Sequence, residues 1–217
     1  MDLPIFNCII NDDPNEETGI YAISFVDCPA NEVDFIALAR KKQEHLNRDQ
    51  HKQVLTGVVL KPEQLIFRHS PEVGDYYIKF SAEQIEKIAQ KMMRTGVALH
   101  NTTHQHQAPL SGNYLVELWI VADPANDKSK ALGFEDLPQG TLMCSYKVED
   151  KDYWNTEVMS GHVKGFSLEG FFTQTIDKTS EKQLNQKCKK MNKKKTTLLG
   201  KIKKFLLDIE AVQKADA

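Results

Sequence analysis

The sequence predicts an α+β protein built on a small closed or strongly curved, mainly antiparallel β-barrel that is surrounded by helices. Three observations favour this fold class. Short apolar segments rich in β-branched and aromatic residues recur between turn signals, as strands do. Only one long segment among them has clear helical periodicity. The 217-residue chain is 41% hydrophobic, which is enough to bury a core.

The first part of the chain, residues 1–52, is expected to form an ordered N-terminal arm that adds strands to the barrel. Residues 5–10 are apolar, residues 11–14 (NDDP) signal a turn, and residues 20–26 alternate as in a strand. Residues 40–52 are charged and carry few apolar side chains, which indicates a solvated linker or an exposed helix.

The central part, residues 53–176, is expected to hold most of the sheet and the clearest helix. Ser81 and Gln84 have the spacing of an S-x-x-Q capping box, apolar side chains follow at helical spacing, and Gly96 suits a C-cap. A short helix is expected over residues 150–159. The predicted strands are residues 54–60, 76–80, 114–121, 140–148 and 163–172.

The composition changes near the C-terminus. Residues 177–195 form a lysine-rich linker that cannot bury a core, and residues 196–217 have the apolar stripe of an amphipathic helix. Two interpretations stay open for this helix. It packs back onto the preceding domain, or it docks on another molecule such as a scaffold protein.

Composition and motifs exclude several classes. A net charge of −2 argues against a protein built to coat nucleic acid, and no apolar run approaches the ~20 residues that span a membrane. The N-terminus lacks the features of a signal peptide, and the four scattered cysteines favour a reducing compartment over a disulfide framework or a zinc knuckle. Walker, Rossmann, HExxH and GxSxG motifs are absent from the sequence.

A histidine cluster stands in the segment LHNTTHQH, residues 99–106. His104 and His106 would share one face of a strand. One of them could act as a general base, because the pKa of histidine lies near neutrality. The pair could instead hold a metal ion with one further ligand, or be plain loop histidines. The candidates for that further ligand are His100, Glu117 and Asp123.

The segment GHVKGFSLEGFF, residues 161–172, has a serine inside an otherwise apolar strand. Ser167 and Glu169 would point to the same side of this strand. Gly165 and Gly170 allow the close backbone approach that a substrate carbonyl needs. The alternative is a structural serine on a strand whose glycines mark bulges.

Glu117 lies inside the apolar strand YLVELWIV, residues 114–121. A buried carboxylate is costly unless it is paired, and a histidine partner would satisfy it and be oriented by it. The alternative is an edge-strand glutamate that faces water. With a base and a nucleophile elsewhere in the chain, these residues fit a serine-histidine-acid triad, whose chain order is not diagnostic.

Five runs in order complete the pattern: GVVLKPEQLIFR, YYIKFSAEQIEKIAQKM, HQHQAPLSGNYLVELWIVADP, GFEDLPQGTLMCSYKVEDKDYW and GHVKGFSLEGFF. Over about residues 54–175 the chain resembles the phage serine proteases of the XkdF type. These belong to the prohead (capsid maturation) proteases of tailed phages and are related in fold to herpesvirus assemblins. The most specific marks are the histidine ahead of the LVELWIV strand and the closing GFSLEG strand.

The resemblance implies that residues 53–176 form a serine endopeptidase domain with an assemblin-like fold and need no metal or organic cofactor. Such enzymes cleave scaffold and major capsid protein extensions inside the prohead, in the host cytoplasm, and often cleave themselves. Scaffold and capsid proteins are then the partners, a homodimer is compatible with the family, and no nucleic acid or membrane is needed.

The resemblance also implies site residues. Ser167 matches the nucleophile and His106 the general base, with His104 as its substitute. Assemblins use a second histidine after the serine, which this chain lacks, so an acid must take that place. Glu117 is the first choice, and the other two candidates are Asp123 and Glu169.

Two other functions remain open from the sequence. The first is a catalytically inactive capsid assembly or scaffold protein on the same fold. The second is a metal-dependent hydrolase that uses His104 and His106.

Overall fold

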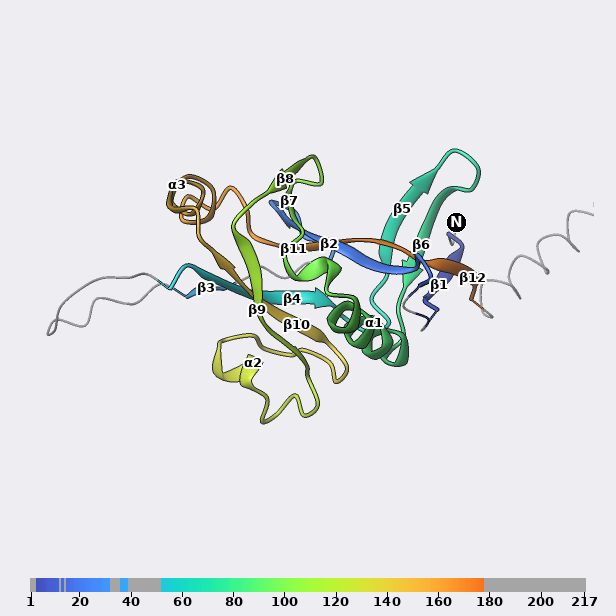
Figure 1. Ribbon diagram of the computed structural model, residues 1–217. Helices are drawn as coiled ribbons and strands as arrows, with labels where there is room; N and C mark the ends of the chain where they lie inside the picture. The colour runs from blue at the N-terminus through green and yellow to red at the C-terminus, as the bar shows by residue number, and fades with distance from the viewer. Residues whose placement is uncertain (1–2, 12, 14, 32–35, 39–51, 178–217) are drawn as a thin grey trace, which may run out of the picture. The chain divides into compact units, whose positions relative to one another are not determined.

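The part of the chain that the computed structural model describes is built mainly from β-strands (Figure 1). It comprises residues 3–11, 13, 15–31, 36–38 and 52–177. The strands in these residues are β1 (Ile5–Ile9), β2 (Gly19–Val26), β3 (Ile36–Leu38), β4 (Val54–Leu60), β5 (Ile66–Ser70), β6 (Gly74–Lys79), β7 (Thr102–His104), β8 (Ala108–Leu110), β9 (Asn113–Ile120), β10 (Leu142–Val148), β11 (Gly165–Phe171) and β12 (Thr173–Ile176).

The strands form three sheets of four strands each within the described residues. Their orders are β12-β1-β6-β5, β3-β4-β10-β9 and β11-β2-β7-β8. Helical segments are few, and most are short. They are α1 (Ala82–Thr95), the 3₁₀ turn Val97–Leu99, α2 (Lys128–Ala131), α3 (Lys151–Tyr153) and the π-helical turn Trp154–Val158. No helix in this part of the chain is long and apolar enough to cross a membrane.

The expected α+β barrel surrounded by helices is wrong. None of the three sheets closes, and α1 is the only helix of more than five residues in the described part. A barrel needs one sheet whose hydrogen bonds run all the way round. Here the N-terminal strands β1, β2 and β3 each join a different sheet, so the pairing is divided instead of closed.

The chain divides into two compact units, Met1–Thr175 and Ile176–Ala217. The expected linker over residues 177–195 and the expected amphipathic helix over residues 196–217 lie outside the described residues, apart from residue 177. The expected linker or helix over residues 40–52 also lies outside them, apart from residue 52.

Helix α1 begins and ends where the sequence predicts. The Ser81 hydroxyl accepts a hydrogen bond from the Gln84 backbone N–H at 3.3 Å, and Gly96 has the left-handed backbone of a C-cap, with φ 69°. Only half of the capping box forms, because the Gln84 side-chain oxygen accepts from the Ile10 N–H at 3.0 Å. That bond ties the end of the β1 segment to the helix.

A cluster of aromatic rings fixes β11 against the rest of the core. Phe166 on β11 packs on Phe25 of β2, with ring centroids 5.5 Å apart, and on Tyr146 of β10, at 5.8 Å. All three side chains are fully buried, and the Tyr146 hydroxyl donates to the Ala98 carbonyl at 2.6 Å. Buried ring pairs of this kind stabilise by about 0.5–1.5 kcal/mol beyond their area. The strand of the predicted nucleophile is therefore anchored in two sheets.

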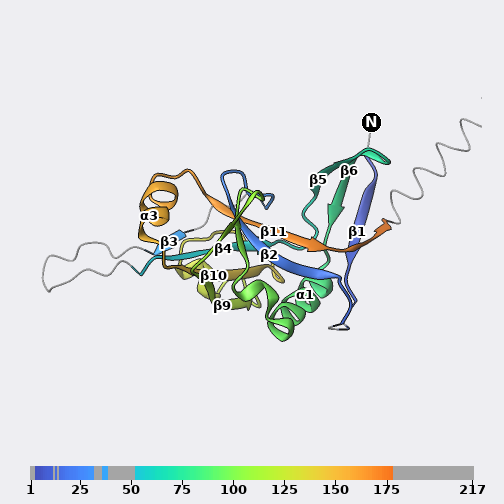
Figure 2. The same ribbon diagram turned by 45° about the horizontal axis from the view of Figure 1, so that its top comes forward.

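Strands β2 and β11 run side by side between the other two sheets in both views (Figures 1 and 2). They pair antiparallel, with Ser167 opposite Ser24 and Glu169 opposite Ala22. On its other side β2 pairs parallel with β7, where Ser24 stands opposite Thr103. These three strands form the surface on which the site is built.

Gly140 offers a test of this packing. Its φ is +90°, and an added Cβ would lie 2.8 Å from the Cβ of Ala82 at the start of α1. Gly74 has a similar φ of +78° but open space around it. Gly74→Ala should cost only the left-handed backbone strain, about 1–2 kcal/mol. Gly140→Ala should cost about 1–3 kcal/mol more through overpacking. Urea unfolding of both variants measures the difference, and equal losses would contradict the described contact between this turn and α1.

Candidate active site

Ser167 lies on β11, at the edge of its sheet, with 7% of its surface exposed. Its side chain shares a face with that of Ser24, since directly opposed residues of an antiparallel pair point to the same side. Among the described residues, the Ser167 hydroxyl has no hydrogen-bond partner. Phe166 and Leu168 point to the opposite face, into the core.

Glu169 follows two residues later and points to the same face as Ser167. Its Oε1 accepts a hydrogen bond from the Thr103 hydroxyl and contacts the Nδ1 of His106 at 3.0 Å. To reach Thr103 on β7, the carboxylate crosses β2 at its small residues Ala22 and Ser24. The Glu169 side chain is only 15% exposed, so it is held in place over the sheet.

His106 stands in the turn between β7 and β8. The turn is closed by a hydrogen bond from the Gln107 N–H to the His104 carbonyl at 2.9 Å. Gln105 and His106 both have left-handed backbone, with φ 51° and 58°. Such strain costs about 1–3 kcal/mol at a non-glycine residue and is concentrated at functional sites. The His106 N–H donates to Ser24 Oγ at 2.8 Å, which fixes the histidine over β2.

Ser24 therefore links the serine to the histidine. Its Cβ lies about 4.5–5.5 Å from that of Ser167, as in any directly opposed pair, and its hydroxyl holds the His106 backbone. A carboxylate only accepts hydrogen bonds, so the Nδ1 of His106 carries the proton in the contact with Glu169. In a neutral imidazole the nitrogen without a proton is then Nε2, on the other side of the ring. A serine hydroxyl, an imidazole and a carboxylate thus share one face of the sheet.

His104 has a different environment from His106. It stands opposite the buried Phe25 in the β2–β7 register, and its Nδ1 contacts the Tyr153 hydroxyl at 3.0 Å. Burial, with a smaller effect from the Glu157 charge, raises the pKa of Tyr153, so this hydroxyl stays protonated. No group of three or more His, Cys, Asp or Glu side chains in the described residues is arranged to hold a metal ion.

Glu117 lies on β9, in the β3-β4-β10-β9 sheet, and not on the face of Ser167. It is half exposed, and its Oε2 accepts from Lys128 Nζ at 2.5 Å and from Ser145 Oγ at 3.1 Å. The hydrogen bond from Lys128 is the largest of the effects that lower the pKa of Glu117. The carboxylate is thus satisfied by a lysine and a serine, and the structure does not bring it to His106.

Asp123 is also separate from Ser167. It stands in the turn after β9, where its two oxygens accept from the Ala125 N–H at 2.9 Å and the Asn126 side-chain amide at 2.8 Å. The Asn126 bond is the first cause of its lowered pKa. Of the three candidate acids, Glu169 alone contacts a candidate base.

Gly170 was expected to allow a substrate carbonyl to approach, but the structure shows a different close approach. An added Cβ would lie 2.5 Å from the Gly19 carbonyl oxygen and 2.8 Å from the Phe172 ring. The close approach that this glycine permits is to the neighbouring strand β2 and to Phe172. It accompanies the bulge between Glu169 and Gly170 in the β11–β2 register.

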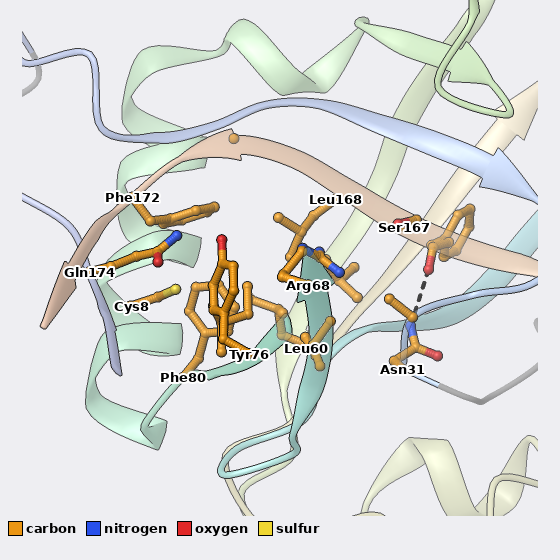
Figure 3. A pocket seen from close by; sticks show the side chains of 16 residues that line it. Cys8, Asn31, Leu60, Arg68, Tyr76, Phe80, Ser167, Leu168, Phe172 and Gln174 are labelled. Atoms are coloured by element: carbon orange, nitrogen blue, oxygen red, sulfur yellow. Dashed lines mark hydrogen bonds between the residues drawn. The ribbon is translucent and has the colours of Figure 1, made fainter. Parts of the chain in front are cut away.

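A pocket of about 150 Å³ lies along β11, and Ser167 and Asn31 are at one end of it (Figure 3). Asn31 donates its side-chain amide to the Val58 carbonyl at 2.7 Å and to the Phe166 carbonyl at 3.1 Å. Toward the other end the pocket is lined by Cys8, Phe172 and Gln174 (Figure 3). It is a concave space that can receive part of a ligand.

Sequence reasoning missed several residues of this region. Ser24, Thr103, Asn31 and Arg68 were not singled out, because each comes from a strand or loop far from Ser167 in the chain. One signal was available for the acid: Glu169 is on the same face as Ser167 by simple alternation.

A serine, a histidine and a carboxylate on the Nδ1 of that histidine are the residue types that a serine hydrolase uses, and no hydrogen bond joins Ser167 to His106 in the described residues. The family model described as "Putative phage serine protease XkdF" matches residues 43–177, and the chain belongs to this family. The resemblance found in the sequence is thereby confirmed. The family name indicates a phage serine protease, which is a hydrolase of peptide bonds. No curated protein and no solved structure matches the chain.

Proposed function

We propose that the protein is the capsid maturation (prohead) serine endopeptidase of a phage. It cleaves the scaffold and the extensions of capsid proteins, and itself, inside the prohead in the host cytoplasm. The observation that carries this proposal is the contact of Glu169 with His106 beside Ser167 on one face of the sheet, in a member of a phage protease family.

In this mechanism the catalytic residues are Ser167, His106 and Glu169. His106 Nε2 takes the proton of the Ser167 hydroxyl while Oγ forms a bond to the substrate carbonyl carbon. The C–N bond then breaks, and the leaving amine takes the proton from Nε2. A water molecule repeats the sequence on the acyl-enzyme and releases the acid product. Glu169 holds the imidazole by Nδ1 and stabilises the imidazolium that forms in both steps.

The acid in this proposal is Glu169 and not Glu117. Glu117 is paired with Lys128, whose positive charge already neutralises it. Glu169 has no lysine or arginine partner among the described residues, and its side chain is largely shielded from solvent. A shielded carboxylate interacts more strongly with a developing imidazolium, because the local dielectric constant is lower.

A serine-directed fluorophosphonate label tests the class of enzyme. The full chain should be labelled at one residue, which peptide mass spectrometry should locate to Ser167. Labelling should be lost in Ser167→Ala and should survive a chelator. Cleavage of co-expressed scaffold that continues in Ser167→Ala but stops with the chelator would support a metal-dependent hydrolase instead. The absence of both labelling and cleavage would support an inactive assembly protein.

A further inference from the structure

Among the described residues that line the pocket beside Ser167, one is charged: Arg68 of β5. In Figure 3 Arg68 lies in the middle of the pocket, between Leu168 and Tyr76. The other described residues that line it are apolar or neutral, and they include Cys8, Asn31, Tyr76 and Leu168.

Arg68 has no carboxylate partner among the described residues. Its guanidinium donates from one nitrogen to the Phe67 carbonyl at 2.8 Å, which leaves most of its five N–H donors for other acceptors. Burial lowers the pKa of Arg68, although an arginine stays charged at every relevant pH. A half-buried cation without a counter-charge is costly, so an anion bound beside it would be favourable.

The neighbouring groups do not supply that anion. Burial raises the pKa of the Cys8 thiol to about 11, despite the opposing effect of Arg68, so the thiol is neutral at pH 7. No aspartate or glutamate of the described residues lines the pocket. The positive charge of Arg68 is therefore uncompensated within it.

The edge of β11 gives a peptide access to this pocket. The Ile23 N–H donates to the Asn101 carbonyl, and the Phe25 carbonyl accepts from the Gln105 N–H. These two residues of β2 therefore direct their backbone groups toward the β7 side. The β11 residues opposite them, Leu168 and Phe166, therefore point their own backbone N–H and C=O groups away from β2, as in the non-hydrogen-bonded pairs of an antiparallel ladder. The bond from Asn31 to the Phe166 carbonyl agrees with this.

Leu168 thus presents its backbone N–H and C=O at an edge with which no described strand pairs, next to Ser167 and the pocket. An extended peptide that adds to this edge would place alternate side chains on the two faces of the sheet. Side chains on one face lie toward the Ser167 hydroxyl, and those on the other lie toward the pocket. A substrate carbonyl can therefore meet Ser167 while a neighbouring side chain enters the pocket.

We infer that this pocket is a specificity subsite that takes an aspartate or glutamate side chain of the peptide and binds its carboxylate with Arg68. Cavities of about 150 Å³ accommodate a molecule the size of benzene, so either side chain fits. Arginine and carboxylate match in a two-point hydrogen-bonded pair. The inference rests on the proposed function, since it describes the substrate of the same site.

Cleavage profiling of a mixed peptide library tests the inference. The full-length wild-type protein should show one subsite enriched in Asp and Glu. With a matched peptide pair, Glu should be preferred over Gln at that position by about 10- to 100-fold in kcat/KM, as hydrogen bonds to charged groups provide. Arg68→Gln should reduce this ratio to about one. Arg94→Gln, which removes an arginine from α1, is the matched control and should keep the wild-type ratio.

The outcomes separate this inference from the proposed function. A wild-type Glu/Gln ratio in Arg68→Gln overturns the subsite and leaves Ser167-dependent cleavage standing. Cleavage that is unchanged in Ser167→Ala overturns the proposed function. Peptide binding to Ser167→Ala gives a readout without turnover: the Glu peptide should bind more tightly than the Gln peptide, and the added Arg68→Gln change should remove that difference. Equal binding of the two peptides by Ser167→Ala would also overturn the subsite.

Discussion

Ser167→Ala should lower kcat/KM for peptide cleavage by about 10⁴- to 10⁶-fold, the range found when a serine nucleophile is removed. The loss should be this large because no other hydroxyl on the same face can replace it. The Ser24 hydroxyl bonds the His106 N–H and the Thr103 carbonyl, and the Thr103 hydroxyl is bonded to Glu169. Of these three hydroxyls, Ser167 has the one for which the described residues supply no hydrogen-bond partner.

Ser24→Ala is the matched control for this prediction. It removes a hydroxyl from the same face and the same row of the sheet. It takes away the hydrogen bond from the His106 N–H, worth about 0.5–1.5 kcal/mol, and the long 3.4 Å bond to the Thr103 carbonyl, so activity should fall by about tenfold or less. Steady-state cleavage of one fluorogenic peptide by the three proteins measures both losses. If Ser24→Ala is as inactive as Ser167→Ala, the hydroxyl of Ser167 does not have the special role assigned to it.

Local sequence patterns predicted the elements better than their arrangement. The helix from Ser81 to Gly96 was visible because caps and periodicity are encoded within the helix itself. The barrel was wrong because sheet order depends on distant pairing. Strands β1 and β6, and β2 and β7, pair in parallel across about 70 or more residues. No turn signal records such pairs, whereas hairpins such as β5–β6 leave a local one.

The same distinction applies to the site. Alternation along one strand placed Ser167 and Glu169 on a common face, since this depends on local geometry alone. The contact of Glu169 with His106 joins residues 63 positions apart and depends on the order β11-β2-β7. Glu117 was preferred as a carboxylate in an apolar strand in need of a partner. Its partners are Lys128 and Ser145, and their proximity is set by the β9–β10 pairing and the turn that follows β9.

Glu169→Gln should lower kcat by about 10²- to 10⁴-fold and change KM little. The substitution keeps the size of the side chain but removes the charge that stabilises protonated His106. Its amide can also donate to Nδ1, which would favour the wrong tautomer of the imidazole. A kcat loss without a KM change is the sign of an interaction that matters in the transition state and not in substrate binding.

Glu117→Gln is the isosteric control at the other candidate acid. Its ion pair with Lys128 is solvent-exposed on both sides, so the free energy of unfolding should fall by at most about 1 kcal/mol and activity should stay near the wild-type value. Parallel kinetics and urea unfolding of the two variants therefore distinguish a catalytic carboxylate from a structural one. If Glu117→Gln loses activity and Glu169→Gln does not, the orienting acid is Glu117. The β9 sheet would then have to approach His106 in the complex with substrate, because the contact of Glu169 with His106 could not be the productive one.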